Sequence, residues 1–597
     1  MAGSATLLPL LGSHVPAPAV ATPVRRVRPS DPAWPEPTLW EQLNQQVGGQ
    51  LIKVPPLLEA CASAQGSERC QEALRNLRNP YFIGEQPSGT QTSGWVDGWQ
   101  SAQSAYAVAA KKTADVVAAV NFARTHNLRL VVKGGGHSYQ GTSNAPDSLL
   151  VWTRPMDAIT LHDAFLGKGC AGRQVPAPAV SVEAGARWMP VYNAVTTRAG
   201  RYVQGGGCAT VGVAGLIQSG GFGSFSKHYG MVAASLLEAE VVTADGAVRI
   251  ANACTNTDLF WALKGGGGGS LGVVTRLTLR THEIPEFFGG VLGVIKASSD
   301  DAFRRLIARF TSFYAEALFN PRWGESVAFR PDNALVMTMV FHGLSQEQAE
   351  AVWKPFLDWV AASPQDFTMP LPDRILAMPA RHWWDPAYLR KYLPETIIPD
   401  GRPGAPEDHV WWAGNAGEAG FFLHGYESAW LPATLLMKEQ QARFNDALFE
   451  GTRHWRVSLH FNKGLAGAPA SAVAAARNTA MNPAALNAFA LTIIAGGGPP
   501  AYPGMPGPGP DMGKARRDAA AIANAIGVLR KLVPGAGSYV SEAGFFDPDW
   551  RRGYWGPNYK RLAAVKKKYD AEGLFFVHHG VGSEEWSADG FTRLAAR

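Results

Sequence analysis

Long apolar runs, blocks of like charge and phosphate-loop signatures are missing from this chain of 597 residues. No window approaches the roughly 18 consecutive apolar residues of a transmembrane helix, so we expect no membrane span. The 55 basic and 49 acidic residues give a net charge of +6 and are spread without runs, which argues against a nucleic-acid surface. The P-loop pattern G-x-x-x-x-G-K-[ST] does not occur.

Cysteine is scarce as well: the chain has five and no C-x-x-C pair, so zinc-ribbon or thioredoxin chemistry is not expected. Cys61 and Cys70 enclose a small polar segment, CASAQGSERC, that a disulfide could close. Cys170 and Cys254 could form a second bridge, and the alternative is four ordinary thiols.

Glycine, in contrast, is abundant, and many of the 65 glycines gather in three stretches. Residues 131–141 read VVKGGGHSYQG, residues 205–230 read GGGCATVGVAGLIQSGGFGSFSKHYG, and residues 256–280 contain five glycines in a row. Because glycine lacks a Cβ and adopts positive φ, such loops let backbone N–H groups approach an anion. The first stretch alone would also fit a tight turn with a solvent-facing histidine. A nicotinamide Rossmann site is not expected, because the match to G-x-G-x-x-G is polyglycine without an acidic residue about 20 positions later.

Together, these stretches resemble the FAD domain of the vanillyl-alcohol oxidase/p-cresol methylhydroxylase superfamily, most closely its berberine-bridge-enzyme-like branch. In that branch the histidine after the glycines bonds to the flavin 8α-methyl group, and the cysteine before the T-V-G-V run bonds to flavin C6. The resemblance therefore implies a bicovalent FAD on His137 and Cys208. It further implies cofactor contacts by Gly134, Gly135, Gly136, Ser138, Tyr139, Thr210, Val211, Gly212, Gly215, Gly221, Val274, Asn558 and Tyr559.

The same resemblance implies an α+β fold with two parts. One is an FAD-binding domain of p-cresol methylhydroxylase type, itself in two pieces, and the other is an α+β substrate domain with an antiparallel sheet covered by helices. We expect an N-terminal extension with helices over residues 1–90, the FAD-binding domain over 91–282 and the substrate domain over 283–535. Residues 536–597 return to the FAD domain, since N-Y-K-R-L from Asn558 and D-A-E-G-L-F from Asp570 resemble the family's C-terminal signature, with Ala571 in place of proline.

Local patterns predict several elements inside these domains. Apolar spacing predicts an amphipathic helix over residues 113–126, followed by a strand over 128–132. Ala-Asp-Gly at 244–246 predicts a hairpin turn. Residues 79–98 are expected to be a polar connector. Residues 496–510, GGGPPAYPGMPGPGP, are too rich in proline for regular structure, and we favour a connector over a lid.

The N-terminus leaves its destination open. Residues 1–21 contain the apolar run ATLLPLL and end in APAVA, which suits a cleavage site, but they lack a basic start and contain Pro9 and Pro16. A secreted or periplasmic protein is one reading, and a cytoplasmic protein is the other.

Hydride transfer to flavin N5 would require a base for the heteroatom proton. Phe222 stands where plant relatives have a catalytic tyrosine, so the role must lie elsewhere. Tyr539, in GSYVSEA, matches the first tyrosine of the family's Y-x-N-Y pattern. We therefore predict Tyr539, or Glu542 beside it, as the base, with Lys463 assisting; ordinary core packing is the alternative for Tyr539.

The predicted reaction is oxidation of an alcohol to a carbonyl, with O₂ reduced to H₂O₂. In the family the third residue after the flavin cysteine gates oxygen, and valine, here Val211, leaves room for it. The alternatives are an oligosaccharide or carbohydrate oxidase, a dehydrogenase with a non-oxygen acceptor, and a flavin-binding protein without turnover. HFNKGLAGAP from His460 and HHGVGSEEW from His578 resemble isoamyl-alcohol-oxidase-like proteins.

The expected partners are a small alcohol or sugar and O₂, in a monomer or weak homodimer. No metal site is expected, because the histidine pair His578 and His579 has no carboxylate or cysteine at ligand spacing.

Overall fold

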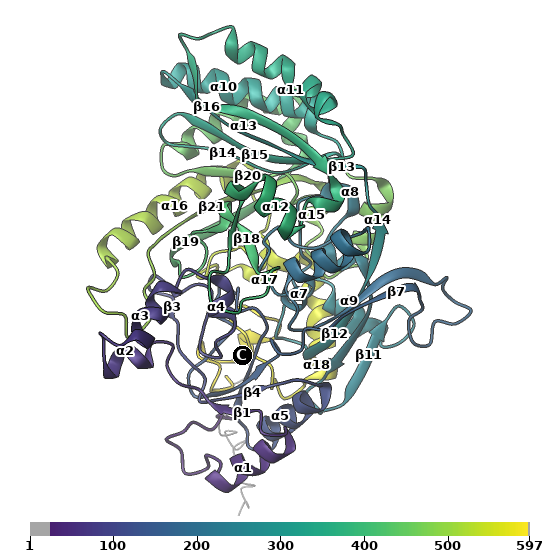
Figure 1. Cartoon of the computed structure of the whole chain (residues 1–597), viewed down its shortest axis with the longest axis vertical. Coiled ribbons are helices and arrows are strands. Elements are labelled where there is room, and N and C mark those ends of the chain that lie inside the picture. The colour runs from purple at the N-terminus through teal and green to yellow at the C-terminus, as the bar shows by residue number, and fades with distance from the viewer. Residues whose placement is uncertain (1–23, 595–597) are drawn as a thin grey trace, which may run out of the picture.

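The computed structural model describes residues 24–594, so the possible signal segment, residues 1–21, lies outside the described residues. Three large sheets and the helices that cover them build the α+β fold that the resemblance implies (Figure 1). Within residues 24–594, no helix combines the length and the apolar character that crossing a membrane requires.

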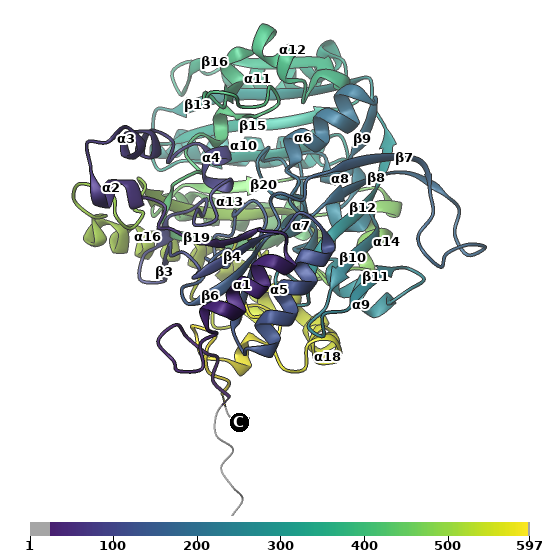
Figure 2. The ribbon, with the colours of Figure 1, turned by 60° about the horizontal axis from the view of Figure 1, so that its bottom comes forward.

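The first sheet holds four strands in the order β1 (Leu51–Lys53), β4 (Tyr106–Ala109), β6 (Ser148–Trp152) and β5 (Arg129–Lys133). Helix α5 (Thr113–Thr125) packs on it, with Val116 and Val120 fully buried, so the predicted amphipathic helix and the strand after it are confirmed. Helix α1 (Pro37–Gln46) runs beside α5 (Figure 2), and its Trp40 stacks on Tyr106 of β4 at 4.0 Å between ring centroids.

The second sheet is antiparallel and has the order β11 (Val248–Asn252), β10 (Leu236–Val242), β12 (Val273–Glu283), β8 (Ala177–Glu183) and β7 (Ile159–Phe165), with β9 (Arg201–Val203) on the far end of β12. The hairpin predicted at residues 244–246 joins β10 to β11 and is confirmed. Two disulfides are present: Cys170–Cys254 ties the loop after β7 to the end of β11, and Cys61–Cys70 joins α2 (Glu59–Ser63) to α3 (Glu68–Arg75).

The third sheet has nine strands and is the largest. Its order is β16 (Phe367–Pro379), β13 (Phe287–Ala297), β15 (Ala334–His342), β14 (Trp323–Phe329), β20 (Val457–His460), β21 (Ala488–Gly498), β19 (Phe422–Pro432), β2 (Gly94–Trp95) and β3 (Trp99–Gln100). Helices α10 (Asp300–Phe313), α11 (Gln346–Ala361), α13 (Lys438–Thr452) and α16 (Met512–Leu532) cover one face (Figure 1). Strand side chains alternate between faces: Val291 and Ile295 of β13 pack into that helix-side core, whereas Leu292 faces the opposite side.

Two expectations about connectors were wrong in part. Residues 79–98 contain helix α4 (Pro80–Gly84) and strand β2, which pairs in parallel with β19. Residues 496–498 extend β21, because the backbone of β19 supplies their hydrogen-bond partners, and only the rest of the stretch is irregular. In both cases tertiary pairing overrides local propensity.

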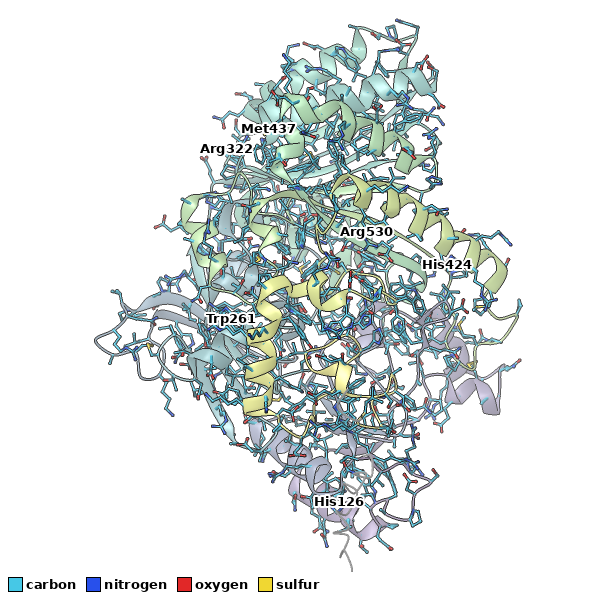
Figure 3. All side chains as sticks on the ribbon, turned by 180° about the vertical axis from the view of Figure 1, so that it is seen from behind. His126, Trp261, Arg322, His424, Met437 and Arg530 are labelled. Carbon is cyan, nitrogen blue, oxygen red and sulfur yellow. A yellow bond between two sulfur atoms is a disulfide. The ribbon has the colours of Figure 1, made fainter. Side chains whose placement is uncertain are left out.

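Residues far apart in the sequence pack against each other at several places, including around Lys227 and Arg561. The Lys227 ammonium in α8 (Ser226–Tyr229) donates hydrogen bonds to the carbonyls of Gly464, Ala466 and Phe489 at 2.7, 2.9 and 3.0 Å. Helix α18 (Tyr559–Tyr569) lies beside α9 (Thr257–Leu263), the helix that carries Trp261 (Figure 3). The Arg561 guanidinium is 3.8 Å from the Trp261 ring. The C-terminal segment thus packs against the second sheet.

Candidate active site

A cavity of about 860 Å³ lies between the second sheet with its glycine loops and the open face of the nine-stranded sheet. Four chain segments supply its walls on the first side: the loop after β5, residues 206–224, residues 267–274 and residues 577–580. Strands β13, β15 and β16 supply the opposite wall. This volume is within the usual range for a ligand site.

The two predicted flavin loops meet backbone to backbone. A Cβ added at Gly135 would lie 3.0 Å from the amide nitrogen of Gly212, and a Cβ at Gly212 would lie 3.0 Å from that of Gly135. The side chain of Lys133, just before the glycines, donates to the carbonyls of Gln86, Pro87 and Gly89 at 3.0, 2.5 and 3.0 Å. Glycine is therefore required where the loops touch, and the buried lysine fixes the start of the first loop.

His137 and Cys208 line the same cavity, and Thr210 lies between them. The Thr210 Oγ1 atom is 3.2 Å from Nε2 of His137 and 3.7 Å from Sγ of Cys208. Burial, reinforced by the charge of Arg187, lowers the pKa of His137 to about 3, so its imidazole is neutral at neutral pH. Burial, with the Glu418 charge second, raises the pKa of the Cys208 thiol to about 12. The site thus presents a neutral imidazole and a protonated thiol side by side.

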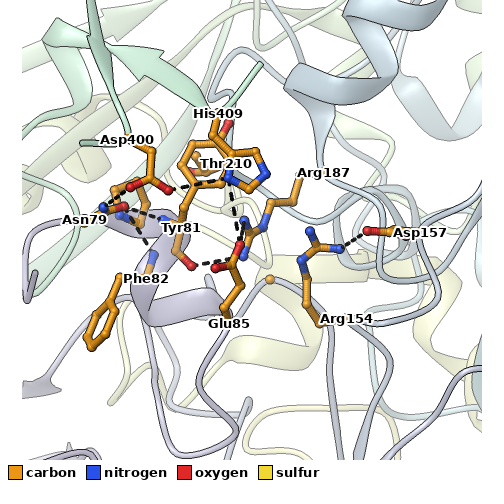
Figure 4. A network of polar contacts seen from close by, with 12 residues as sticks. Asn79, Tyr81, Phe82, Glu85, Arg154, Asp157, Arg187, Thr210, Asp400 and His409 are labelled. Carbon is orange, nitrogen blue, oxygen red and sulfur yellow. Dashed lines mark hydrogen bonds and ion pairs between the residues drawn. The ribbon is translucent and has the colours of Figure 1, made fainter. Parts of the chain in front are cut away.

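The charge that acts on His137 belongs to a polar network that sequence reasoning missed (Figure 4). The fully buried Arg187 donates to Glu85 at 3.2 Å, and Glu85 also accepts from Arg402 at 2.8 Å. Arg402 in turn pairs with Asp400 at 2.6 Å, next to His409. Glu85 and the Tyr81 carbonyl, at 3.2 and 3.4 Å, hold the Arg187 guanidinium in place, which keeps a positive charge close to His137.

The predicted catalytic residues come together in the cavity. The Lys463 ammonium contacts both carboxylate oxygens of Glu542, at 2.6 and 2.5 Å. Tyr539 packs edge-to-face on Phe222, at 5.5 Å between centroids. Its hydroxyl lies near Ser541 and the Gly221 amide without a well-aligned hydrogen bond, and burial raises its pKa. The Glu542 carboxylate, held by Lys463, is therefore better suited to accept a proton than the Tyr539 phenol.

Three further groups in the cavity were not predicted. Glu325 adopts φ +59°, which is unusual for a residue with a Cβ, and accepts from Ser224 Oγ at 2.5 Å. Glu418 lies on the loop after β18 (Val410–Trp412), and burial raises the pKa of both carboxyl groups. Tyr426 stacks on Tyr139 at 4.7 Å. Glu325 could have been found from the sequence, because it is a charged residue in the strand sequence WGESVAF. No comparable sequence feature marks Glu418.

Most of the predicted cofactor residues line the cavity: Gly134, Gly135, Gly136, His137, Ser138, Tyr139, Cys208, Val211, Gly212, Gly215 and Val274. Four predicted residues do not. Thr210 lies between His137 and Cys208, and Gly221, at φ +70°, is packed against Leu216 and Val232. Asn558 donates to the Met481 carbonyl at 2.7 Å, and Tyr559 donates to Glu584 at 2.5 Å, so both brace the C-terminal segment.

The outer end of the cavity is more apolar. Large side chains line it, namely Leu376, Met378, Trp383, Leu393 and Trp412. At the exposed rim, Arg374 and Glu395 form an ion pair at 2.6 Å. An aromatic and aliphatic chamber therefore opens from a charged interior. Among the described residues, no group of three or more His, Cys, Asp or Glu side chains gathers in a way that could hold a metal ion.

The residues of the inner wall fit FAD. Gly215 lines the cavity, and a Cβ built there would have no heavy atom within 4 Å. The absence of a side chain at Gly215 therefore leaves room for a ligand to approach the backbone. Glycines of three loops line the same surface, and glycine-rich loops of this kind suit an anionic diphosphate. His137 and Cys208 then offer two nucleophilic side chains on one wall.

Comparison with known proteins agrees with this geometry. Residues 104–252 match the model of an FAD binding domain, and residues 538–582 match the model described as berberine and berberine like. The VAO-type flavoprotein oxidase VAO615 of Thermothelomyces thermophilus is 28% identical over 96% of this chain and 95% of its own. The crystal structure of MtVAO615 from Myceliophthora thermophila C1 gives a TM-score of 0.77 at 26% identity, covering 96% of this chain and 100% of that one.

A more distant neighbour is the glucooligosaccharide oxidase of Acremonium strictum, whose FAD is described as 6-S-cysteinyl and 8α-N1-histidyl. It shares the fold with a TM-score of 0.62 at 18% identity, covering 88% of this chain and 99% of that one.

The fold, the glycine-walled cavity and the matched domains define an FAD-dependent oxidoreductase. The chain carries an FAD binding domain and a berberine-like C-terminal region, and over nearly its whole length it is similar to VAO-type flavoprotein oxidases.

Proposed function

We propose that this oxidoreductase is an oxidase that converts an alcohol to a carbonyl compound and reduces O₂ to H₂O₂, with FAD bound through both His137 and Cys208. The observation that carries the proposal is that these two side chains face one cavity, bridged by Thr210, together with the Lys463–Glu542 pair. The bicovalent FAD named for the Acremonium strictum enzyme supports the same arrangement.

The flavin, when bound, supplies the hydride acceptor. Glu542 accepts the proton of the substrate hydroxyl, and the Lys463 ammonium keeps that carboxylate oriented through two contacts. Tyr539 supports Glu542 through the tight turn in which the Glu542 amide donates to the Tyr539 carbonyl at 2.8 Å. The apolar outer chamber holds the body of the substrate and excludes water from the reacting carbon.

Oxygen use rests on Val211, which lines the cavity three residues after Cys208. A leucine there would add one methylene to a closely packed wall and would narrow the space available to a diatomic gas. The two disulfides also fit an oxidising compartment, and we therefore favour export over a cytoplasmic site.

The nearest competing function is oxidation of an oligosaccharide, which the name of the Acremonium strictum neighbour suggests. Trp383 and Trp412 in the outer chamber could stack on sugar rings as well as on aromatic alcohols. A dehydrogenase that passes electrons to a quinone is the second alternative.

One assay separates these functions. The purified holoenzyme is offered aliphatic alcohols, including isoamyl alcohol, benzylic alcohols and oligosaccharides, and H₂O₂ is measured. Peroxide equal to carbonyl product with an alcohol supports the proposal. Peroxide with the sugars alone would assign an oligosaccharide oxidase, and turnover that needs an added quinone or dye would assign a dehydrogenase.

A further inference from the structure

Glu418 is held against the segment that carries Cys208, although 210 positions separate the two residues. On one side of Glu418, the indole N–H of Trp412 donates to the Gly207 carbonyl at 3.1 Å. On the other side, the Gly420 carbonyl accepts from Ser93 Oγ at 2.8 Å. The loop is therefore anchored on both sides of Glu418, and these contacts fix the position of Glu418 beside Cys208.

Within this frame the carboxylate is oriented toward the thiol. The Cys208 S–H donates to Oε2 of Glu418 at 3.6 Å, a reasonable distance for sulfur. The other carboxylate oxygen, Oε1, accepts from Asn415 Nδ2 at 2.6 Å. Within residues 24–594, the other side chain at hydrogen-bond distance from the thiol is the Thr210 hydroxyl, at 3.7 Å, and a hydroxyl is a poor base.

The electrostatics create a need for such a base. With a pKa raised to about 12, the Cys208 thiol would be ionised in only about one molecule in 10⁵ at pH 7. The thiolate is the nucleophilic form of cysteine, so attack without a base would be slow. Burial raises the pKa of Glu418, which makes its carboxylate a better proton acceptor than an exposed one.

We propose that Glu418 is the base that takes the Cys208 proton when Cys208 attaches to the flavin, a step that rests on the bicovalent FAD proposed above. The sulfur forms a bond to the ring carbon in place of the hydrogen that this carbon carried. The hydrogen leaves as a proton, and the electron pair of the broken C–H bond is accepted finally by O₂. Overall, the thiol hydrogen, the ring hydrogen and one O₂ become one H₂O₂.

The test compares holoenzymes purified under the same conditions: wild type, Glu418→Gln, Glu418→Asp and the control Glu395→Gln, which removes a carboxylate from the rim of the same cavity. Free thiols are alkylated, and mass spectrometry of tryptic peptides gives the fraction of Cys208 that carries flavin. We expect at least a tenfold lower fraction in Glu418→Gln, with flavin retained on His137. Glu395→Gln should match the wild type, and Glu418→Asp should keep the attachment at a reduced rate.

A second measurement separates proton transfer from mere positioning. Aerated Glu418→Gln enzyme is incubated between pH 7 and 9.5, and attachment at Cys208 should accelerate about tenfold per pH unit as hydroxide replaces the missing base. A Glu418→Gln enzyme that attaches as completely as the wild type, or slowly with no pH dependence, overturns the role of Glu418 alone. A folded wild type without flavin on Cys208 overturns the bicovalent proposal as well. Should Glu418→Gln fail to fold, as judged by circular dichroism, Glu418→Asp takes its place. Attachment that is slower than in the wild type and accelerates with pH supports the role, and a wild-type rate with wild-type pH dependence overturns it.

Discussion

The identity of the proton acceptor can be decided by two substitutions, Tyr539→Phe and Glu542→Gln. A phenol with the ordinary pKa of 10.0 is only about 0.1% ionised at pH 7, and burial together with the charge of Glu542 raises the pKa of Tyr539 further. As a base, the phenolate is therefore disfavoured by at least about 10³. The Glu542 carboxylate, in contrast, is held in place by the Lys463 ammonium, which contacts both of its oxygens.

We expect Tyr539→Phe to change the rate of flavin reduction by less than about threefold. Glu542→Gln should lower it by about 10²–10⁴, which corresponds to about 2.7–5.4 kcal/mol in the barrier. Glutamine has the same length and still offers an oxygen to Lys463, so the loss reports the missing base rather than a missing side chain.

The assay is anaerobic stopped-flow reduction at saturating substrate, followed by flavin absorbance. Covalent flavin content and thermal stability are measured for each variant, so that only loaded, folded enzyme is compared. Glu427→Gln is the matched control. Glu427 lies on β19, pairs with Arg530 of α16 and is not among the residues that line the cavity. A hundredfold loss in Tyr539→Phe with Glu542→Gln within threefold of wild type would refute the reasoning, and rates within threefold in both would place the base elsewhere.

Three other outcomes follow from the structure. Val211→Leu should slow reoxidation of the reduced enzyme by O₂ many-fold and leave anaerobic reduction unchanged; stopped-flow mixing with oxygenated buffer checks both. His137→Ala and Cys208→Ala should each retain flavin after acid precipitation, whereas the double variant should release it, and release from the wild type would contradict bicovalent attachment. Replacing both Cys170 and Cys254 by serine opens a loop with a sequence separation of 84 and should lower the free energy of unfolding by about 4–5 kcal/mol in denaturant titration.

The sequence predicted the part of the site that short motifs encode. Glycines next to His137 and Cys208 mark loops whose backbones must approach each other, and the structure has these loops in contact at Gly135 and Gly212. Glu418 could not be predicted in this way, because it reaches Cys208 from 210 positions away on an irregular loop. No local pattern reports such a meeting, since it depends on how the nine-stranded sheet is placed against the loops.

The same limit applies to other parts of the chain. Strand β2 has only two residues, Gly94 and Trp95, and exists because β19 offers a free edge. Asn558 and Tyr559 matched a family signature, yet their hydrogen bonds go to Met481 and Glu584. A motif gives the identity of a residue, whereas the partner of its side chain is set by the packing around it.

The pairing of β2 with β19 also restricts how the enzyme can open. Strand β2, which precedes the glycine loop at residues 134–136, pairs with β19 at the edge of the nine-stranded sheet. Lys227 also donates hydrogen bonds to three carbonyls across the boundary between the two halves. A hinge motion that parted the two halves would have to break both attachments at once. We therefore expect substrate to enter and leave through the outer chamber without separation of the two halves, and turnover should tolerate cross-links between them.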